Sequence, residues 1–280
     1  MSRIENLFND YESQGKGGII VEIPMLSPIP ETQLNIASLL VEAGIDVIQL
    51  AVPYRFPWMQ GPRIQRIMKQ AAEEGIDYKQ SFSTFGKLVE AYPDQIFMPV
   101  GFYGGLRKMG EDNYISELKK LNIDIVDVPD YPVVHDNDPL GFYQKLRNNG
   151  IDFVNCISVD LALSEEGSKA YKDFVEVVKK SYGFCFLIAT KGGKTGEVDD
   201  FPYEKLLKAK NSIKKVQEQY NRPCPIVAVC GISTPQQVHK MVHELGLHVM
   251  FGSALFTRMV NGESNEEILK FLKEMKAAAL

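Results

Sequence analysis

The sequence has no excess of positive charge, no long apolar run and no cysteine motif. Its 280 residues carry a formal net charge of −5, so we expect neither nucleic acid nor an anionic membrane as a partner, because both need a basic patch. No apolar run reaches the length of a membrane span, and the acidic N-terminus lacks a signal-like core. The cysteines show no C-x-x-C spacing, which suggests reduced thiols in a cytoplasmic protein.

No linker-like, repetitive or low-complexity stretch divides the chain either. Hydrophobic residues make up 45% of it, which is ample for one large core. We therefore treat residues 1–280 as a single domain.

What the sequence does contain is a regular alternation of short apolar runs and helical patterns, which is typical of parallel β/α units. Strands are predicted at 18–24, 47–52, 95–102, 123–128, 153–159, 184–190, 225–229 and 248–252. Helices are predicted at 3–11, 32–43, 62–75, 112–121, 140–149, 164–181, 203–220 and around 238–245, with a last helix that begins at Ser264. The pattern predicts an α/β fold, a closed (β/α)8 TIM barrel, with an open doubly wound sheet as the alternative.

A recurring tripeptide supports the barrel. Gly44-Ile45-Asp46, Asn122-Ile123-Asp124 and Gly150-Ile151-Asp152 each stand between a predicted helix and the next strand. We expect the Gly or Asn to take the left-handed cap and the Ile to be buried.

Glycine-rich segments follow the last three predicted strands, at 190–196, 230–235 and 251–254. In such barrels these loops bind phosphate, because glycine lets backbone N–H groups approach an anion and helix N-termini favour negative charge. A small phosphorylated metabolite is therefore the expected ligand, although the same glycines could serve tight turns alone. The segment at 190–196 ends in Gly-Lys-Thr-Gly but is not a P-loop, since Ile188 stands where that motif needs its first glycine. The candidate phosphate-binding residues are Gly196, Gly231, Ile232, Gly252 and Ser253.

Several segments resemble the tryptophan synthase α subunit family. Residues 49–53 (Gln-Leu-Ala-Val-Pro) are similar to its Glu-Leu-Gly-x-Pro, and residues 54–65 to its Ser-Asp-Pro-x-Ala-Asp-Gly-Pro-x-Ile-Gln loop and helix start. Residues 129–132, 193–196, 231–238 and 252–254 resemble the family's remaining loops in the same order. The resemblance covers almost the whole chain. It implies a TIM barrel that cleaves indole-3-glycerol phosphate to indole and glyceraldehyde 3-phosphate, without a cofactor or metal.

Two departures from that family fall on its chemistry. The resemblance implies a general acid/base at position 49 and a carboxylate that handles the indole N–H proton at position 60. This chain has Gln49 and Gln60 there, and an amide can hydrogen-bond but cannot titrate. The loop that helps the α subunit meet its β subunit carries Phe56 in place of Asp, which also questions the usual partner.

New acidic residues occur in the predicted strands. Glu22 interrupts 18–24, Asp127 interrupts 123–128, and Asp160 ends 153–159. A carboxylate in a buried parallel strand is costly unless it is paired or functional. If Glu22 points inward, it is the best candidate for a relocated acid/base, and Asp127 is a second, which can face either way. The alternative for each is a strand-end residue paired with a neighbouring base.

Phe102, Tyr103 and Lys191 are candidates for the substrate pocket, with ordinary packing or solvation as the alternative. Three functions then compete. The first, slightly favoured, is a divergent lyase or isomerase on a sugar-phosphate-like substrate. The second is a non-catalytic binding protein for a phosphorylated metabolite. The third is an ordinary tryptophan synthase α subunit.

Overall fold

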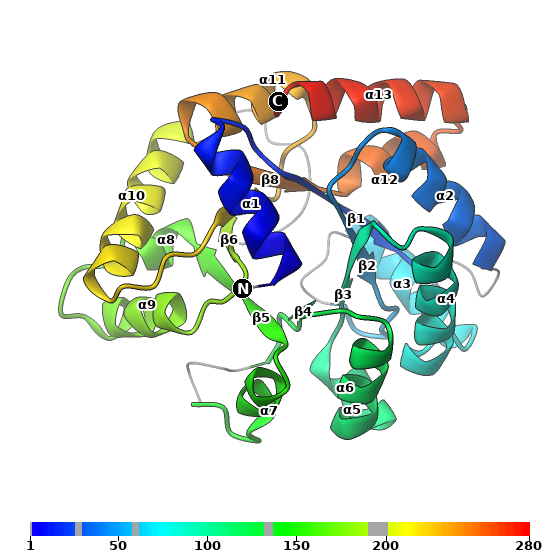
Figure 1. Ribbon diagram of the computed structural model, residues 1–280, viewed down its shortest axis with the longest axis horizontal. Helices are drawn as coiled ribbons and strands as arrows, with labels where there is room; N and C mark the ends of the chain where they lie inside the picture. The colour runs from blue at the N-terminus through cyan, green and yellow to red at the C-terminus, as the bar shows by residue number, and fades with distance from the viewer. Residues whose placement is uncertain (1, 26–29, 58–61, 132–136, 190–200) are drawn as a thin grey trace.

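The computed structural model describes residues 2–25, 30–57, 62–131, 137–189 and 201–280 (Figure 1). Eight parallel strands form a closed barrel in which each strand pairs with the next along the chain and the last pairs with the first. The strands are β1 (Ile19–Pro24), β2 (Val47–Ala51), β3 (Ile96–Val100), β4 (Ile125–Asp127), β5 (Asp152–Ser158), β6 (Cys185–Ile188), β7 (Ile226–Val229) and β8 (His248–Phe251). The predicted TIM barrel is confirmed.

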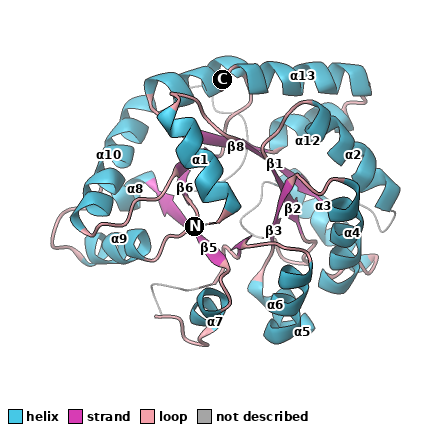
Figure 2. Cartoon of the chain, viewed as in Figure 1, coloured by secondary structure: helices cyan, strands magenta, loops and turns pink. Residues whose placement is uncertain are grey.

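Helices surround the barrel on its outside (Figure 2). They are α1 (Arg3–Ser13), α2 (Pro30–Glu42), α3 (Pro62–Glu73), α4 (Tyr78–Ala91), α5 (Tyr103–Met109), α6 (Glu111–Lys120), α7 (Phe142–Asn148), α8 (Val159–Ala162), α9 (Lys169–Lys179), α10 (Tyr203–Gln219), α11 (Pro235–His239) with a π-helical turn (Lys240–Glu244), α12 (Ser253–Val260) and α13 (Asn265–Ala277). Among the described residues, no helix is both long and apolar enough to cross a membrane.

Alternation along the strands sorts the buried side chains into two layers. Ile20, Val47 and Ile125 belong to a cluster inside the barrel. Their strand neighbours, such as Val21 and Ile48, belong to the larger layer between strands and helices. Both faces of every strand are therefore buried, which is why the strands read as continuous apolar runs.

Helix α1 covers the end of the barrel where the strands begin, and it lies in front of the strands in Figure 1. Its Ile4 and Phe8 are fully buried against the interior cluster. The Phe8 ring stacks on His248 with 4.1 Å between ring centroids. A Cβ atom on Gly18 would lie 2.2 Å from the Phe8 ring, so the close approach of α1 requires glycine there.

A buried ion pair joins three distant segments on the same side. Lys276 of α13 lies 2.6 Å from an Asp46 carboxylate oxygen, and the Tyr11 hydroxyl donates a hydrogen bond to the other oxygen at 2.8 Å. Asp46 also accepts the Ile19 N–H at 2.8 Å. The start of β1 is thus tied to both ends of the chain.

The predicted caps are confirmed. Gly44, Asn122 and Gly150 all have positive φ angles, between 52° and 74°, and the isoleucines that follow them are buried. The last helix was predicted to begin at Ser264, and a capping box of Ser264 and Glu267 does begin α13 there.

Other helix predictions need correction. Helices α4 and α5 were not expected, and the strand predicted at 95–102 ends at Val100 because Phe102 begins α5. The helix predicted at 164–181 begins only at Lys169, because Gly167 is left-handed and the Ser168 side chain caps the Tyr171 N–H.

Replacing Phe8 by alanine should lower the free energy of unfolding by about 3–5 kcal/mol, because it leaves a cavity at the base of the barrel. Urea denaturation followed by circular dichroism measures this change. Asp10, exposed on the same helix, supplies the control: Asp10→Ala should change the stability by less than about 0.5 kcal/mol. Equal effects of the two substitutions would contradict the assigned role of α1.

Candidate active site

Three polar side chains face the barrel interior near the carboxyl ends of the strands. Glu22, Gln49 and Asp127 each stand two residues beyond a member of the interior cluster, on β1, β2 and β4 respectively. Glu22 and Gln49 are also direct neighbours in the β1–β2 pairing. The orientation of Asp127, open from the sequence, is therefore inward.

Gln49 and Asp127 form a hydrogen bond across the interior. Gln49 Nε2 donates to Asp127 Oδ2 at 3.0 Å. The Gln49 side chain is fully buried and Asp127 is 5% exposed. Side chains from alternate strands of a TIM barrel share a layer, so β2 and β4 bring these two groups together over β3.

The environment of Asp127 favours its protonated form. Burial raises the pKa of this carboxyl from its usual 3.8 to about 8. The nearby charges of Glu22 and Asp130 raise it too, whereas the hydrogen bond from Gln49 lowers it. At neutral pH most molecules therefore hold a neutral Asp127 beside Glu22, an arrangement in which two carboxyl groups can share one proton.

Two acceptor atoms in this layer have no hydrogen-bond donor in contact among the described residues. They are Gln49 Oε1 and Asp127 Oδ1, and both atoms are buried. Buried polar atoms are nearly always hydrogen-bonded, so an unmatched pair marks a place where a proton or a ligand supplies a donor.

Asp130, in the turn after β4, was missed as a site residue although it lies in the resemblance segment 129–132. It is half-buried, and burial raises its pKa. Its Oδ1 accepts the backbone N–H of Tyr103 at 2.8 Å. The turn after β4 is thereby fixed to the start of α5.

The two predicted aromatic residues point to different places. Phe102 is buried, belongs to a cluster with Ala51 and Val100, and stacks on Tyr54 with ring centroids 5.0 Å apart. The Tyr103 ring instead packs against Tyr131 and Phe142, and its hydroxyl donates to Glu111 at 2.5 Å. Phe102 thus lies beside inward-facing strand ends, while the Tyr103 ring lies among outer helices.

β5 adds a thiol that the sequence reading overlooked. Cys156 belongs to the edge of the interior cluster, and burial and then the charge of Asp127 raise its thiol pKa. Alternation from Val154 would have placed it inward. Asn155 points outward and donates to the Lys180 carbonyl at 2.9 Å. Asp160 is exposed in the first turn of α8.

The predicted phosphate end lies at the ends of β7 and β8. Cys230 and Gly231 both have left-handed backbones, with φ angles of 75° and 84°, and Ile232 is buried. The Gln237 side chain accepts the Ser233 N–H at 2.8 Å. The amides at the start of α11 are therefore partly engaged within the protein.

The start of α12 carries no such side-chain cap. Gly252 is its N-cap residue and Ser253 its first residue, and no side chain caps the amides there. A Cβ atom on Gly252 would lie 2.9 Å from the Glu22 carbonyl oxygen. The phosphate-type loop and the strand that carries Glu22 are therefore in direct contact.

The remaining predicted residues, Gln60, Lys191 and Gly196, lie outside the described residues. Within the described ranges, no group of three or more His, Cys, Asp or Glu side chains is placed to hold a metal ion.

Comparison with known proteins places this chain in a family. A sequence model described as "Tryptophan synthase alpha chain" matches residues 8–279. The chain belongs to the tryptophan synthase alpha chain family. It is 27% identical over 276 residues to the tryptophan synthase alpha chain of Petrotoga mobilis, covering 99% of this chain and 96% of that one, and 26% identical to that of a Thermoanaerobacter species, covering 98% and 96%.

Solved structures agree on the fold of the family. A structure of Mycobacterium tuberculosis tryptophan synthase has a TM-score of 0.82 at 19% identity and covers 99% of this chain and 98% of its own. The tryptophan synthase subunit alpha of Legionella pneumophila has a TM-score of 0.77 at 18% identity, with 100% and 98% covered.

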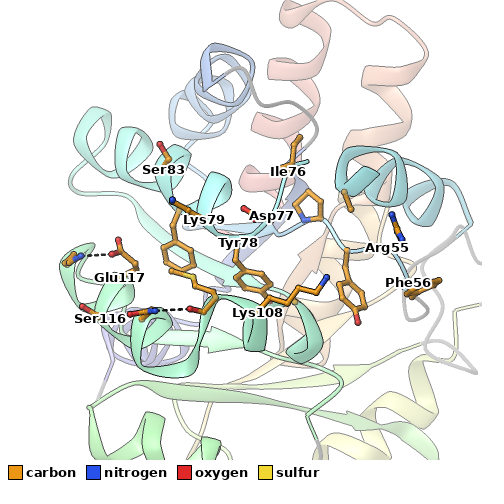
Figure 3. A pocket seen from close by; sticks show the side chains of 18 residues that line it. Arg55, Phe56, Ile76, Asp77, Tyr78, Lys79, Ser83, Lys108, Ser116 and Glu117 are labelled. Atoms are coloured by element: carbon orange, nitrogen blue, oxygen red, sulfur yellow. Dashed lines mark hydrogen bonds and ion pairs between the residues drawn. The ribbon is translucent and has the colours of Figure 1, made fainter. Parts of the chain in front are cut away.

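A hollow lies outside the barrel of this family member (Figure 3). It has a volume of about 960 Å³ and is bordered by the segment after β2 and by α4, α5 and α6. Aromatic side chains, including Tyr54 and Tyr78, line it together with Arg55 and Lys108. Phe56 stands at this groove with 66% of its surface exposed.

Replacing Asp127 by asparagine should change how stability depends on pH. Between about pH 4 and about pH 8 the folded protein holds a proton that the unfolded chain has released, so the stability of the natural protein falls as the pH rises. The variant has no carboxyl group at this position, so this cause of falling stability is absent from it. Its stability relative to the natural protein should therefore grow by about 1 kcal/mol per pH unit.

Urea denaturation at several pH values measures this difference. Asp160→Asn, a change of the same kind at an exposed carboxylate, should give a curve parallel to that of the natural protein. A parallel curve for Asp127→Asn as well would refute the buried neutral carboxyl.

Proposed function

We propose that this protein is a carbon–carbon lyase of the tryptophan synthase alpha type, acting on a phosphorylated substrate with Asp127 and Glu22 as proton carriers. The observation that carries the proposal is the buried Asp127 carboxyl, held at 3.0 Å by Gln49 with a pKa raised to about 8. A carboxyl group with a pKa near the working pH is suited to both giving and receiving a proton.

The reaction needs one acid and one base. The base removes the proton from a hydroxyl group, the adjacent carbon–carbon bond breaks, and an aldehyde forms. The electron pair of the broken bond remains on the leaving carbon, which takes a proton from the acid. Neutral Asp127 can supply that proton while the Glu22 carboxylate accepts the other. Two neighbouring carboxyl groups, one neutral and one ionised, divide the acid and base roles in this way.

The loop after β8 supports a phosphate group at one end of the substrate. Gly252 and Ser253 precede the uncapped amides of α12, and such helix starts bind phosphate. Because Gly252 contacts the backbone of Glu22, a phosphate held here lies close to the proposed base.

Whole-chain kinship supports indole-3-glycerol phosphate as the substrate to test. Gln49 occupies the position where the family carries its acid/base. In our proposal Gln49 holds Asp127 in place and does not transfer protons itself. A non-catalytic binding protein remains the competing proposal, favoured by this amide alone.

Purified protein should release indole and glyceraldehyde 3-phosphate from indole-3-glycerol phosphate. Asp127→Asn and Glu22→Gln should each lower kcat by at least about a hundredfold, because each removes a proton carrier. KM should change little. Activity should fall above about pH 8, where Asp127 loses its proton.

Asp160→Asn is the matched control and should retain full activity. Indole release that survives both substitutions would reject Asp127 and Glu22 as proton carriers. Tight substrate binding without any turnover would favour the non-catalytic alternative.

We also propose a tryptophan synthase β-type subunit as partner, docked at the groove beside Phe56. An exposed aromatic ring at the edge of a hollow is typical of a protein contact. Phe56→Ala removes the exposed ring and should weaken the complex with the β chain of the same organism at least about tenfold in calorimetry. Val260→Ala, at an exposed apolar residue on α12, should leave the affinity unchanged, and equal effects would exclude this surface.

A further inference from the structure

The interior layer near the strand ends offers hydrogen-bond acceptors. Glu22 and Asp127 bring carboxyl oxygens, and Gln49 brings an amide oxygen. The only amide donor in this trio, Gln49 Nε2, is already engaged with Asp127. Among the described side chains that point into this part of the barrel there is no lysine, arginine or histidine. A ligand group that enters this layer therefore meets mainly oxygen atoms that accept hydrogen bonds.

Two of these acceptors indicate what the layer is built to receive. Asp127 Oδ1 and Gln49 Oε1 are buried without a donor among the described residues, on side chains that are 5% and 0% exposed. While the site is free of ligand, a proton bound to Asp127 Oδ1 can be donated to Gln49 Oε1, so that one proton satisfies both oxygens. A ligand N–H group can take the place of that proton. An apolar ring would instead bring no donor to Asp127 Oδ1 or Gln49 Oε1, which is costly when such atoms are buried.

Apolar groups surround this layer on the remaining strands. Met98, Val229 and Cys156 belong to the interior cluster or pack against it. The oxygen atoms on β1, β2 and β4 therefore share this layer with apolar side chains on β3, β5 and β7. Such an arrangement fixes the position of a polar group at one end of a ligand and gives specificity for it.

We propose that the site selects a substrate that carries a nitrogen-centred donor, an amine or amidine with several N–H bonds, at the end opposite its phosphate. This inference rests on the proposed function in taking the phosphate to bind at the start of α12. It deepens that function by naming the substrate class. Indole carries only one N–H bond, so indole-3-glycerol phosphate is then a slow substrate.

A matched set of simple phosphate esters tests the inference by calorimetry. Straight-chain alkyl phosphates of increasing length end in a methyl group, an amine or a trimethylammonium group. At the best length, the amine should bind at least about tenfold tighter than the methyl-ended ester. The trimethylammonium ester has the same charge but no N–H bond, so it should bind no more tightly than the methyl-ended ester.

Variants show where the preference arises. Asp127→Asn and Glu22→Gln each keep the shape of the side chain. In each variant the amine-ended ester should bind less than about threefold more tightly than the methyl-ended ester. Asp160→Asn should keep the full gain. Circular dichroism and binding of the methyl-ended ester show that each variant remains folded.

Equal affinity for the amine and methyl esters, or for the amine and trimethylammonium esters, would overturn the inference while leaving the phosphate site intact. Absence of binding by every ester would overturn it too. The proposed lyase activity is judged separately by indole release. A protein that lacks lyase activity can therefore be told apart from one that lacks the preference for an amine.

Discussion

The arrangement of the site depends on one hydrogen bond inside the barrel, from Gln49 Nε2 to Asp127 Oδ2 at 3.0 Å. The Asp127 carboxyl is almost completely buried, so it must be neutral or paired. Gln49 fixes the position of Asp127, and the negative charge of Glu22 helps to keep it protonated. The protonation of Asp127 at neutral pH thus follows from burial and from its two neighbours, Glu22 and Gln49.

The strands could be predicted from sequence because both of their faces are buried and each reads as an apolar run. The caps were predictable for another reason: Gly44, Asn122 and Gly150 each adopt the left-handed backbone that these residue types favour. Helices α4 and α5 were missed. Tyr78, Phe82 and Phe85 of α4 are fully or nearly buried, yet their aromatic spacing was not recognised as a helical face. In α5 a pair of glycines masks the helix.

The site was predictable in part. Glu22 stood out because a single acid interrupts an apolar strand, but Val21 and Ile23 flank it and leave its direction open. Asp127 stood out for the same reason, and its direction did not follow either. Its strand has only three residues, with valine on both sides, so no local pattern separates the inner face from the outer one. That choice depends on strand register in the closed barrel, which a single sequence does not reveal.

Glutamine at position 49 is best understood together with its new neighbours. With Glu22 and Asp127 already facing the interior, a glutamate at 49 would place a third carboxyl group in the same buried layer. Like charges at such distances cannot all ionise, and a second neutral acid would compete with Asp127 for its hydrogen bond. An amide avoids both problems, because it donates to Asp127 and adds no charge. An amide at position 49 therefore suits a layer that already holds the carboxyl groups of Glu22 and Asp127. Gly252 joins this layer to the start of α12, because its backbone packs directly against that of Glu22.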